Sequence, residues 1–152
     1  QWVDDSRDPF GTSSRSWAEK WLKRLHTPGA AIADVNAARQ VSDMFLLDYL
    51  QGNEDRFSGG NILEDKTGKL WFIDNAEAFG SSSQPRRDLD RVKRFDRKVI
   101  DALRKATPKD FAREVGPWLT PAELRALLER RTHVLDHVDA AVKKYGEANV
   151  YL

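Results

Sequence analysis

Apolar residues recur every three or four positions in the first third of the chain, a spacing that places them on one face of an α-helix. Residues 1–14 are polar and rich in Asp, Ser, Gly and Pro, so we expect a loop there. Helices are predicted over residues 16–26 and 35–50, because each stretch ends in a turn sequence. Their expected buried positions are Trp17, Trp21, Leu22 and Leu25 in the first, and Val35, Ala38, Val41, Phe45 and Leu46 in the second.

The pattern changes between residues 61 and 73, where two short apolar runs flank the turn sequence Asp65-Lys66-Thr67-Gly68. This arrangement is typical of a β-hairpin. The second strand is expected to end at Asp74, before a small and polar segment over residues 75–85. Because a hairpin brings its two ends together, Asn61 and Asp74 are predicted to lie side by side.

The remainder of the chain is expected to be helical. One helix is predicted from Leu89 to Leu103, and Thr107-Pro108 opens a short second one. Residues 120–123 form a capping-box sequence that opens a long helix through about Tyr145. Its expected inner positions are Leu124, Leu128, Leu135, Val138 and Val142. The predicted fold class is therefore mainly α with a small β-hairpin, with a lead-in and first helix over residues 1–34 and one domain over residues 35–152.

Composition narrows the possible functions. A chain of 152 residues with 40% hydrophobic residues can bury one core, and its net charge of +1 creates no overall field that would attract nucleic acid or an anionic membrane. The five tryptophans are scattered without a basic stripe, so we expect them to fill the core and grooves rather than to stack on bases. No apolar run is long enough for a membrane span, there is no cysteine, and the start lacks the features of a signal peptide. A soluble chain of unknown compartment is expected.

Three polar residues suggest a chemistry through their order along the chain. Asp55 follows the second helix, Asn61 opens the hairpin and Asp74 ends it. Phosphoryl transfer needs a carboxylate to receive the acceptor hydroxyl's proton, and oxygen ligands to hold divalent metal on the nucleotide phosphates. The sequence therefore predicts Asp55 as the base and Asp74 and Asn61 as ligands. Such oxygen ligands suit Mg²⁺ or Mn²⁺.

Several neighbouring residues allow more than one interpretation. Asp and Asn are common in turns for structural reasons, so each of the three residues also has a purely structural interpretation. Arg56 could be a solvated charge, or it could hold the loop or neutralise phosphate beside Asp55. Gly59-Gly60 could expose amides to phosphate, although a simple turn explains the pair as well. His133 and His137 lie one helical turn apart, but no base follows His133 and we do not expect a metal there.

The same residues carry a family resemblance. Residues 48–56 read Asp-Tyr-Leu-Gln-Gly-Asn-Glu-Asp-Arg, and residues 72–80 read Phe-Ile-Asp-Asn-Ala-Glu-Ala-Phe-Gly. These two elements resemble the Four-jointed and Golgi casein kinase family of atypical, secretory-pathway-type kinases, and the long closing helix is similar to that family's last helix. The resemblance covers residues 35–145. It implies a kinase-like C-lobe in which Asp55 is the catalytic Asp and Asp74 the metal-binding Asp.

The chain also departs from that pattern. Five residues separate Asp55 from Asn61, one more than in the usual protein-kinase loop, and the D-R-x-x-x-x-N element alone also resembles phosphoinositide-kinase-like and HipA-like enzymes. The resembled family's eukaryotic members carry paired cysteines and this chain has none, so we expect a bacterial-type relative or a differently stabilised one. No strand-rich N-lobe precedes residue 35, so the chain is expected to be a piece of something longer, or to take the N-lobe from another segment or chain.

The sequence thus predicts an atypical kinase that moves the ATP γ-phosphate to a hydroxyl of a protein or glycan. Asp55 and Arg56 are the candidate catalytic residues, Asp74 and Asn61 the candidate metal ligands, and Leu63 a candidate floor under adenine. The alternative is a catalytically silent, kinase-like binding or scaffold domain. An exposed apolar surface where an N-lobe would dock favours the enzyme, whereas a sealed polar surface favours the scaffold. Ser81, Ser82 and Ser83 are candidate autophosphorylation sites.

Overall fold

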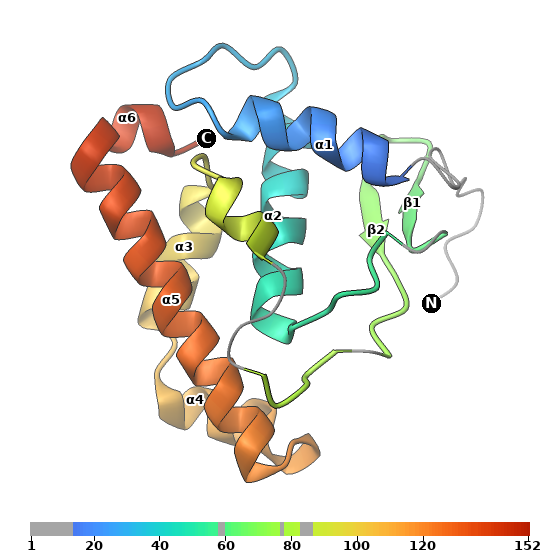
Figure 1. Cartoon of the computed structure of the whole chain (residues 1–152), viewed down its shortest axis with the longest axis vertical. Helices are drawn as coiled ribbons and strands as arrows, with labels where there is room; N and C mark the ends of the chain where they lie inside the picture. The colour runs from blue at the N-terminus through green and yellow to red at the C-terminus, as the bar shows by residue number, and fades with distance from the viewer. Residues whose placement is uncertain (1–13, 58–59, 77, 83–86) are drawn as a thin grey trace.

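The computed structural model describes residues 14–57, 60–76, 78–82 and 87–152, and it is mainly helical with one antiparallel hairpin (Figure 1). The predicted coarse fold class is confirmed. The helices are α1 (Ser14–Leu25), α2 (Val35–Gln51), α3 (Arg97–Lys105), α4 (Pro108–Glu114), α5 (Pro121–Tyr145) and α6 (Glu147–Val150). The strands are β1 (Ile62–Glu64) and β2 (Leu70–Phe72), and the short 3-10 helices are η2 (Arg87–Arg91) and η3 (Gly116–Trp118).

Helix α2 runs through the centre of the molecule, with the hairpin on one side and α3 and α5 on the other (Figure 1). Its first turn is held by Asp34, whose carboxylate accepts a hydrogen bond from the Ala37 amide at 2.8 Å. The helix ends at Gly52, where a φ of 69° favours glycine. Most of its apolar side chains are buried, but Val35 is 39% exposed, so the prediction that it joins the core is wrong.

Helix α1 belongs to the same core as α2. Its residues Ala18, Leu22 and Leu25 are fully buried. Burying a side chain the size of leucine is worth roughly 1.5–3 kcal/mol, so α1 makes a substantial contribution to stability. The helix begins at Ser14, two residues before the predicted start.

The hairpin pairs Ile62 with Phe72, Leu63 with Trp71 and Glu64 with Leu70. Ile62 and Leu70 are buried against the helices. Because successive side chains of a strand point to opposite faces, Leu63 and Trp71 share the outer face. Both remain half-buried.

The region from Leu89 to Leu103 contradicts the prediction of one helix. It contains η2 and α3, separated by residues 92–96. Phe95 in this break forms a parallel bridge with Tyr151, donating its amide to Val150 O and accepting from the Leu152 amide, both at 2.9 Å. These bonds use the backbone groups of Phe95 that a continuous helix would need.

Helix α5 begins with the predicted capping box, in which Thr120 and Glu123 bond each other's backbone amides. Its buried face is Ala126, Leu127, Arg130, Val134, Val138 and Ala141. Of the five positions expected to face inward, Val138 is fully buried and the other four are half-buried, so the predicted face is rotated from the observed one. Trp118 before this helix is 84% exposed, so it does not fill the core as predicted. None of the helices in the described part of the chain has the length and apolar character needed to cross a bilayer.

Candidate functional site

The candidate site begins in the loop that follows α2. Asn53 is buried, and its Oδ1 accepts a hydrogen bond from the Asp55 amide at 2.9 Å. Its Nδ2 donates to Oδ1 of Asn75 at 3.2 Å, on the far side of the hairpin. An asparagine bonded two residues ahead forms a local turn that fixes the backbone direction. The backbone of Asp55 is therefore fixed by Asn53, which the sequence analysis quoted only as part of the element over residues 48–56.

Arg56 is the hydrogen-bonding centre of this region. Its side chain is 1% exposed, and its Nη2 donates to Oδ1 of Asp48 at 2.8 Å and to Oδ1 of Asn75 at 2.7 Å. Its Nη1 donates to the carbonyl oxygens of Asn61 at 3.1 Å and Ile73 at 2.6 Å. The rigid fork of a guanidinium suits such multiple bonding. Arg56 therefore ties the end of α2 to both ends of the hairpin.

This placement decides between the interpretations of Arg56. A buried guanidinium bonded in this way cannot reach a phosphate at the surface or be a solvated charge. These bonds favour the interpretation in which Arg56 holds the loop as a positioning residue, and its predicted part in catalysis stays a prediction.

Asp48, which sequence reasoning quoted only as part of a motif, is the acidic partner of Arg56. Nε of Arg56 donates to both of its carboxylate oxygens at 3.1 Å. Burial raises the pKa of Asp48, while the hydrogen bonds and charge of Arg56 oppose that shift. Its signal in the sequence was an acidic residue near the end of an apolar helix, eight positions before an arginine.

The structure brings Asn61 next to the segment that contains Asp74. The Ile73 amide donates to Asn61 O at 3.1 Å, so the first residue of the hairpin lies opposite the residue directly before Asp74. Nδ2 of Asn61 donates to the Asp55 carbonyl at 3.0 Å, which fixes the amide group beside the loop. Asp55, Asn61 and Asp74 thus belong to segments that are bonded to one another.

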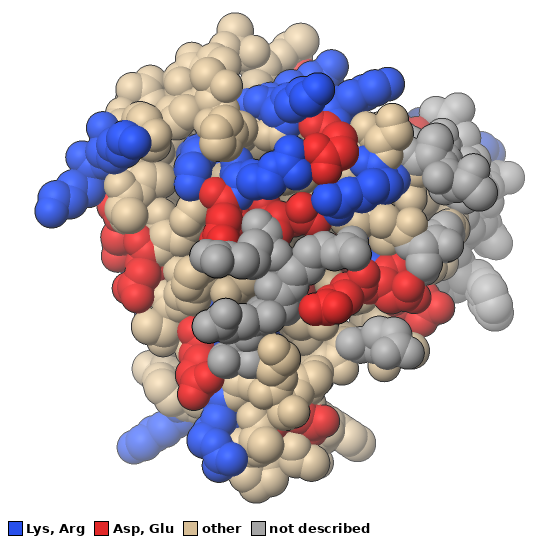
Figure 2. Space-filling view, viewed as in Figure 1, with Lys and Arg blue, Asp and Glu red and all other residues tan. Residues whose placement is uncertain are grey.

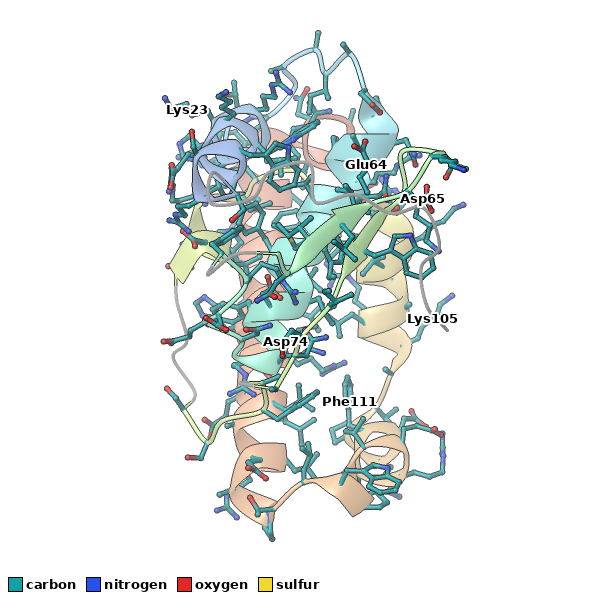
Figure 3. The ribbon with its side chains drawn as sticks, turned by 90° about the vertical axis from the view of Figure 1, so that its right-hand side faces the viewer. Lys23, Glu64, Asp65, Asp74, Lys105 and Phe111 are labelled. Atoms are coloured by element: carbon teal, nitrogen blue, oxygen red, sulfur yellow. The ribbon has the colours of Figure 1, made fainter. Side chains whose placement is uncertain are left out.

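Asp74 is exposed at the point where the chain leaves the hairpin, at the end opposite the turn that carries Glu64 and Asp65 (Figure 3). Its φ of 51° lies in the left-handed region, which Asp tolerates better than most residues. Its Oδ1 lies 3.4 Å from the Ala76 amide, at the long end of hydrogen bonding.

The segment after Asp74 is held by a second buried arginine. Arg130 of α5 is fully buried and donates to Leu50 O at 2.8 Å, to Gly80 O at 3.1 Å and to Ser82 O. Burial lowers the pKa of Arg130, because the charged guanidinium loses its contact with water, while the nearby Tyr49 and Glu129 oppose the shift. Arg130 therefore joins α5, the end of α2 and the segment beyond Asp74. Sequence reasoning placed this residue only within the family's last helix.

The outer face of the hairpin offers a small apolar platform. Leu63 lies there beside Trp71, whose indole Nε1 donates to Asp65 Oδ2 at 3.0 Å. The ammonium group of Lys69 lies 3.7 Å from the centre of the Trp71 ring, within cation–π range. Hydrogen bonds from the turn hold the pKa of Asp65 well below its usual range.

The surface charge differs between two neighbouring parts of one face. Lys and Arg side chains gather over the part of the surface where α1 lies, and acidic side chains lie below them in this view (Figure 2). The predicted positions Gly59 and Ser83 lie outside the described residues.

The candidate metal ligands Asp74 and Asn61 can be compared with the ligands that a divalent ion requires. Among residues 14–57, 60–76, 78–82 and 87–152, no group of three or more His, Asp or Glu side chains is placed to hold a metal ion. Mg²⁺ commonly takes one or two carboxylates from a protein and completes its octahedron with phosphates and water. At this end of the hairpin, Asp74 offers one carboxylate and Asn61 one amide oxygen.

The two histidines of α5 have structural neighbours. Nε2 of His133 lies 3.2 Å from Asp90 Oδ1, and its ring stacks on Tyr49. Nε2 of His137 lies 2.8 Å from Val92 O, and burial lowers the pKa of this histidine. Both rings therefore help to seat η2 and the following residues on α5.

The sequence was compared with protein-family models and with curated proteins. No protein-family model matches the chain, and a search of curated proteins gave no significant match.

Proposed function

We propose that this chain carries the catalytic half of an atypical, kinase-like phosphotransferase, which transfers the γ-phosphate of ATP to a hydroxyl of a protein or glycan. The observation that carries the proposal is the bonding of Arg56, which ties the loop of Asp55 to both ends of the hairpin. Phosphoryl transfer depends on such positioning more than on covalent chemistry by the protein.

Each residue has a separate role in this proposal. Asp55 accepts the proton of the acceptor hydroxyl, and Asp74 and Asn61 hold Mg²⁺ or Mn²⁺ on the nucleotide. The bound metal would neutralise phosphate charge. Leu63 lies under the adenine, with Trp71 beside it on the outer face of the hairpin.

The kinase-like C-lobe is the architecture that we infer for residues 35–152. It is supported by the order of the elements, with a central helix, a loop, a hairpin and further helices. Ile73, directly before Asp74, is 39% exposed, and an exposed apolar side chain beside the site favours an enzyme completed by an N-lobe segment or chain over a sealed scaffold domain.

Calorimetric titration of ATP with Mn²⁺ or Mg²⁺ tests the proposal. Asp74→Asn keeps a residue type that tolerates a positive φ but removes the charge, so metal-dependent ATP binding should weaken at least about tenfold. Asp136→Asn, which changes an exposed residue of α5, is the matched control and should bind as the wild type does.

The role of the base is tested separately. Asp55→Asn should retain metal–ATP binding while losing about 10²–10⁴-fold in phosphate transfer, the usual contribution of a general base. A wild-type chain that binds no ATP with either metal contradicts the proposal and supports the silent scaffold.

A further inference from the structure

An apolar groove lies on one side of the molecule, between α2, α3 and β2. Its volume is about 420 Å³, and its walls include Leu47, Leu50, Phe72, Val99 and Leu103. Figure 3 looks onto this side, where α3 lies beside α2 and Lys105 marks the last turn of α3. Apolar sites of roughly 300–1,000 Å³ are typical of binding pockets.

The groove is built from two helical stripes and one strand residue. On α2, Leu46 and Leu50 are buried while Leu47 between them is 37% exposed. On α3, Val99, Ala102, Leu103 and Ala106 follow the i, i+3, i+4, i+7 spacing of one helix face. Two flanking helices with apolar facing walls form the shape into which a third amphipathic helix packs.

Asp43 interrupts this apolar lining. Its Oδ1 is buried, and no hydrogen-bond partner for it exists among the described residues. Burial raises the pKa of Asp43 to about 7; the neighbouring Asp96 adds to the shift and Arg39 opposes it. Arg39 lies 3.9 Å from Asp96, so this end of the groove has two carboxylates and one nearby cation. Asp43 is the only charged residue among the described residues that line the groove, so a cation brought by a ligand would meet a carboxylate in an apolar setting.

We propose that the groove is the docking site of an amphipathic helix of a partner polypeptide, whose apolar stripe fills the groove and whose single Lys or Arg faces Asp43. Charge complementarity selects this occupant, because a purely apolar helix would cover the Asp43 carboxylate without bringing an opposite charge to it. The inference is independent of the proposed function, since docking requires neither nucleotide nor metal.

The docked helix would contact the candidate site through Phe72. This residue lines the groove, and the Arg56 guanidinium lies 5.7 Å from the centre of its ring. A helix packed against Phe72 therefore adds apolar contacts to the strand that ends beside Asp74. Docking should slow amide exchange of the hairpin.

Selection from a displayed library of 18-residue helix-forming peptides tests the proposal. Peptides retained by the full chain should share an apolar i, i+3, i+4, i+7 stripe with one Lys or Arg at a fixed position beside it. Their affinities are then measured by fluorescence anisotropy with the synthetic peptides. Leu47→Glu should weaken binding more than tenfold, because it places a charge in the apolar wall.

A double-mutant cycle tests the charge pairing. Asp43→Asn should weaken the basic peptide about five- to tenfold but leave its Lys→Gln counterpart unchanged, as expected for a pair of close opposite charges. The wild-type protein should bind the basic peptide more tightly at pH 8 than at pH 6, and Asp43→Asn should remove that difference. Asp136→Asn and Asp74→Asn should behave as the wild type, which separates this test from that of the nucleotide site.

Three results would overturn the proposal. The first is a library that yields no peptide binding tighter than about 100 μM, a free energy of about −5.5 kcal/mol. The second is a set of peptides that bind Leu47→Glu as well as the wild type, or that show no basic preference. The third is sedimentation showing a dimer that Leu47→Glu dissociates, which would assign the groove to a second copy. Circular dichroism of each variant confirms that it is folded.

Discussion

The loop-and-hairpin region and the helical body are held together by different interactions. In the helical body, fully buried apolar side chains such as Leu22, Val134 and Ile100 pack against one another. Around Asp55, the contacts are hydrogen bonds that converge on Arg56 and Asp48. Packing tolerates exchange between apolar residues of similar volume, whereas a buried ionic network fails when one member is lost. We therefore expect the candidate site to tolerate single substitutions less well than the helical body does.

The largest expected effect comes from breaking the ionic network. Arg56→Met leaves the buried Asp48 carboxylate without its partner and should lower the free energy of unfolding by about 3–5 kcal/mol. Urea unfolding followed by circular dichroism measures the change. Combining it with Asp48→Leu removes the unpaired charge and should recover part of the loss. A loss below about 1 kcal/mol for Arg56→Met would contradict the comparison.

Truncation in the helical body should have the next largest effect. Leu22→Ala removes a fully buried side chain from the interface of α1 with the core and should cost about 2–4 kcal/mol. Hydrogen exchange should show faster opening of α1 while the amides of the hairpin keep their native order of protection. Leu128→Ala, at a half-buried position of α5, is the control and should cost less. An equal decrease in the free energy of unfolding for the two variants would contradict this prediction, because it would show that the effect does not depend on burial.

Asp43 lies midway along α2 and should have a smaller, pH-dependent effect. Its pKa in the folded protein is raised to about 7, so folding favours the protonated form and stability falls as pH rises from about 4 to 7. Asp43→Asn should therefore stabilise the protein by about 1–2 kcal/mol at pH 8, a value reduced for partial solvent contact, and by almost nothing at pH 4. Thermal unfolding at both pH values measures this difference. Equal stabilisation at both would refute the assignment.

The smallest expected effect concerns a polar contact at the surface. Thr120→Ala removes the cap of α5 and should cost about 1 kcal/mol. Thr132 lies in the middle of the same helix and is exposed, so Thr132→Ala should leave stability unchanged or raise it slightly. Chemical unfolding measures the free energy of unfolding of the two variants. Comparison with Arg56→Met then shows how much more a polar contact contributes to stability when it is buried. Equal effects of the two threonine changes would contradict the cap assignment.

Local patterns predicted the elements whose structure depends on neighbouring residues. The periodicity of α2, the turn of the hairpin and the capping box at Thr120 are local signals, and each leads to the observed element. The prediction failed near Phe95, because the break there depends on bonds to Val150 and Leu152, more than fifty positions away. Asp96 was a local hint, since its side chain accepts from the Lys98 amide as an N-cap.

The sequence predicted where the candidate site residues lie along the hairpin, but it did not predict the buried arginines that hold the site together. The sequence order placed Asn61 and Asp74 at the two ends of one hairpin, and the Ile73–Asn61 bond shows the ends meeting. No local sequence pattern revealed that Arg56 is buried. Nor did any local pattern reveal that Arg130 donates to the carbonyl of Gly80, which lies fifty positions earlier in the chain. A charged residue inside the core violates the apolar pattern on which burial predictions rest, and its partners are distant in the sequence.

The left-handed backbone at Asp74 limits which mutations can persist at this position. Asn and Gly share its tolerance of a φ of 51°, while most other residues add a conformational cost there. Of these three residue types, only aspartate carries a negative charge. Random single substitutions at this codon will therefore tend to lose the charge, the backbone fit or both. A deep mutational scan selected for stability should accept Asn and Gly, whereas one selected for metal-dependent ATP binding should retain Asp alone.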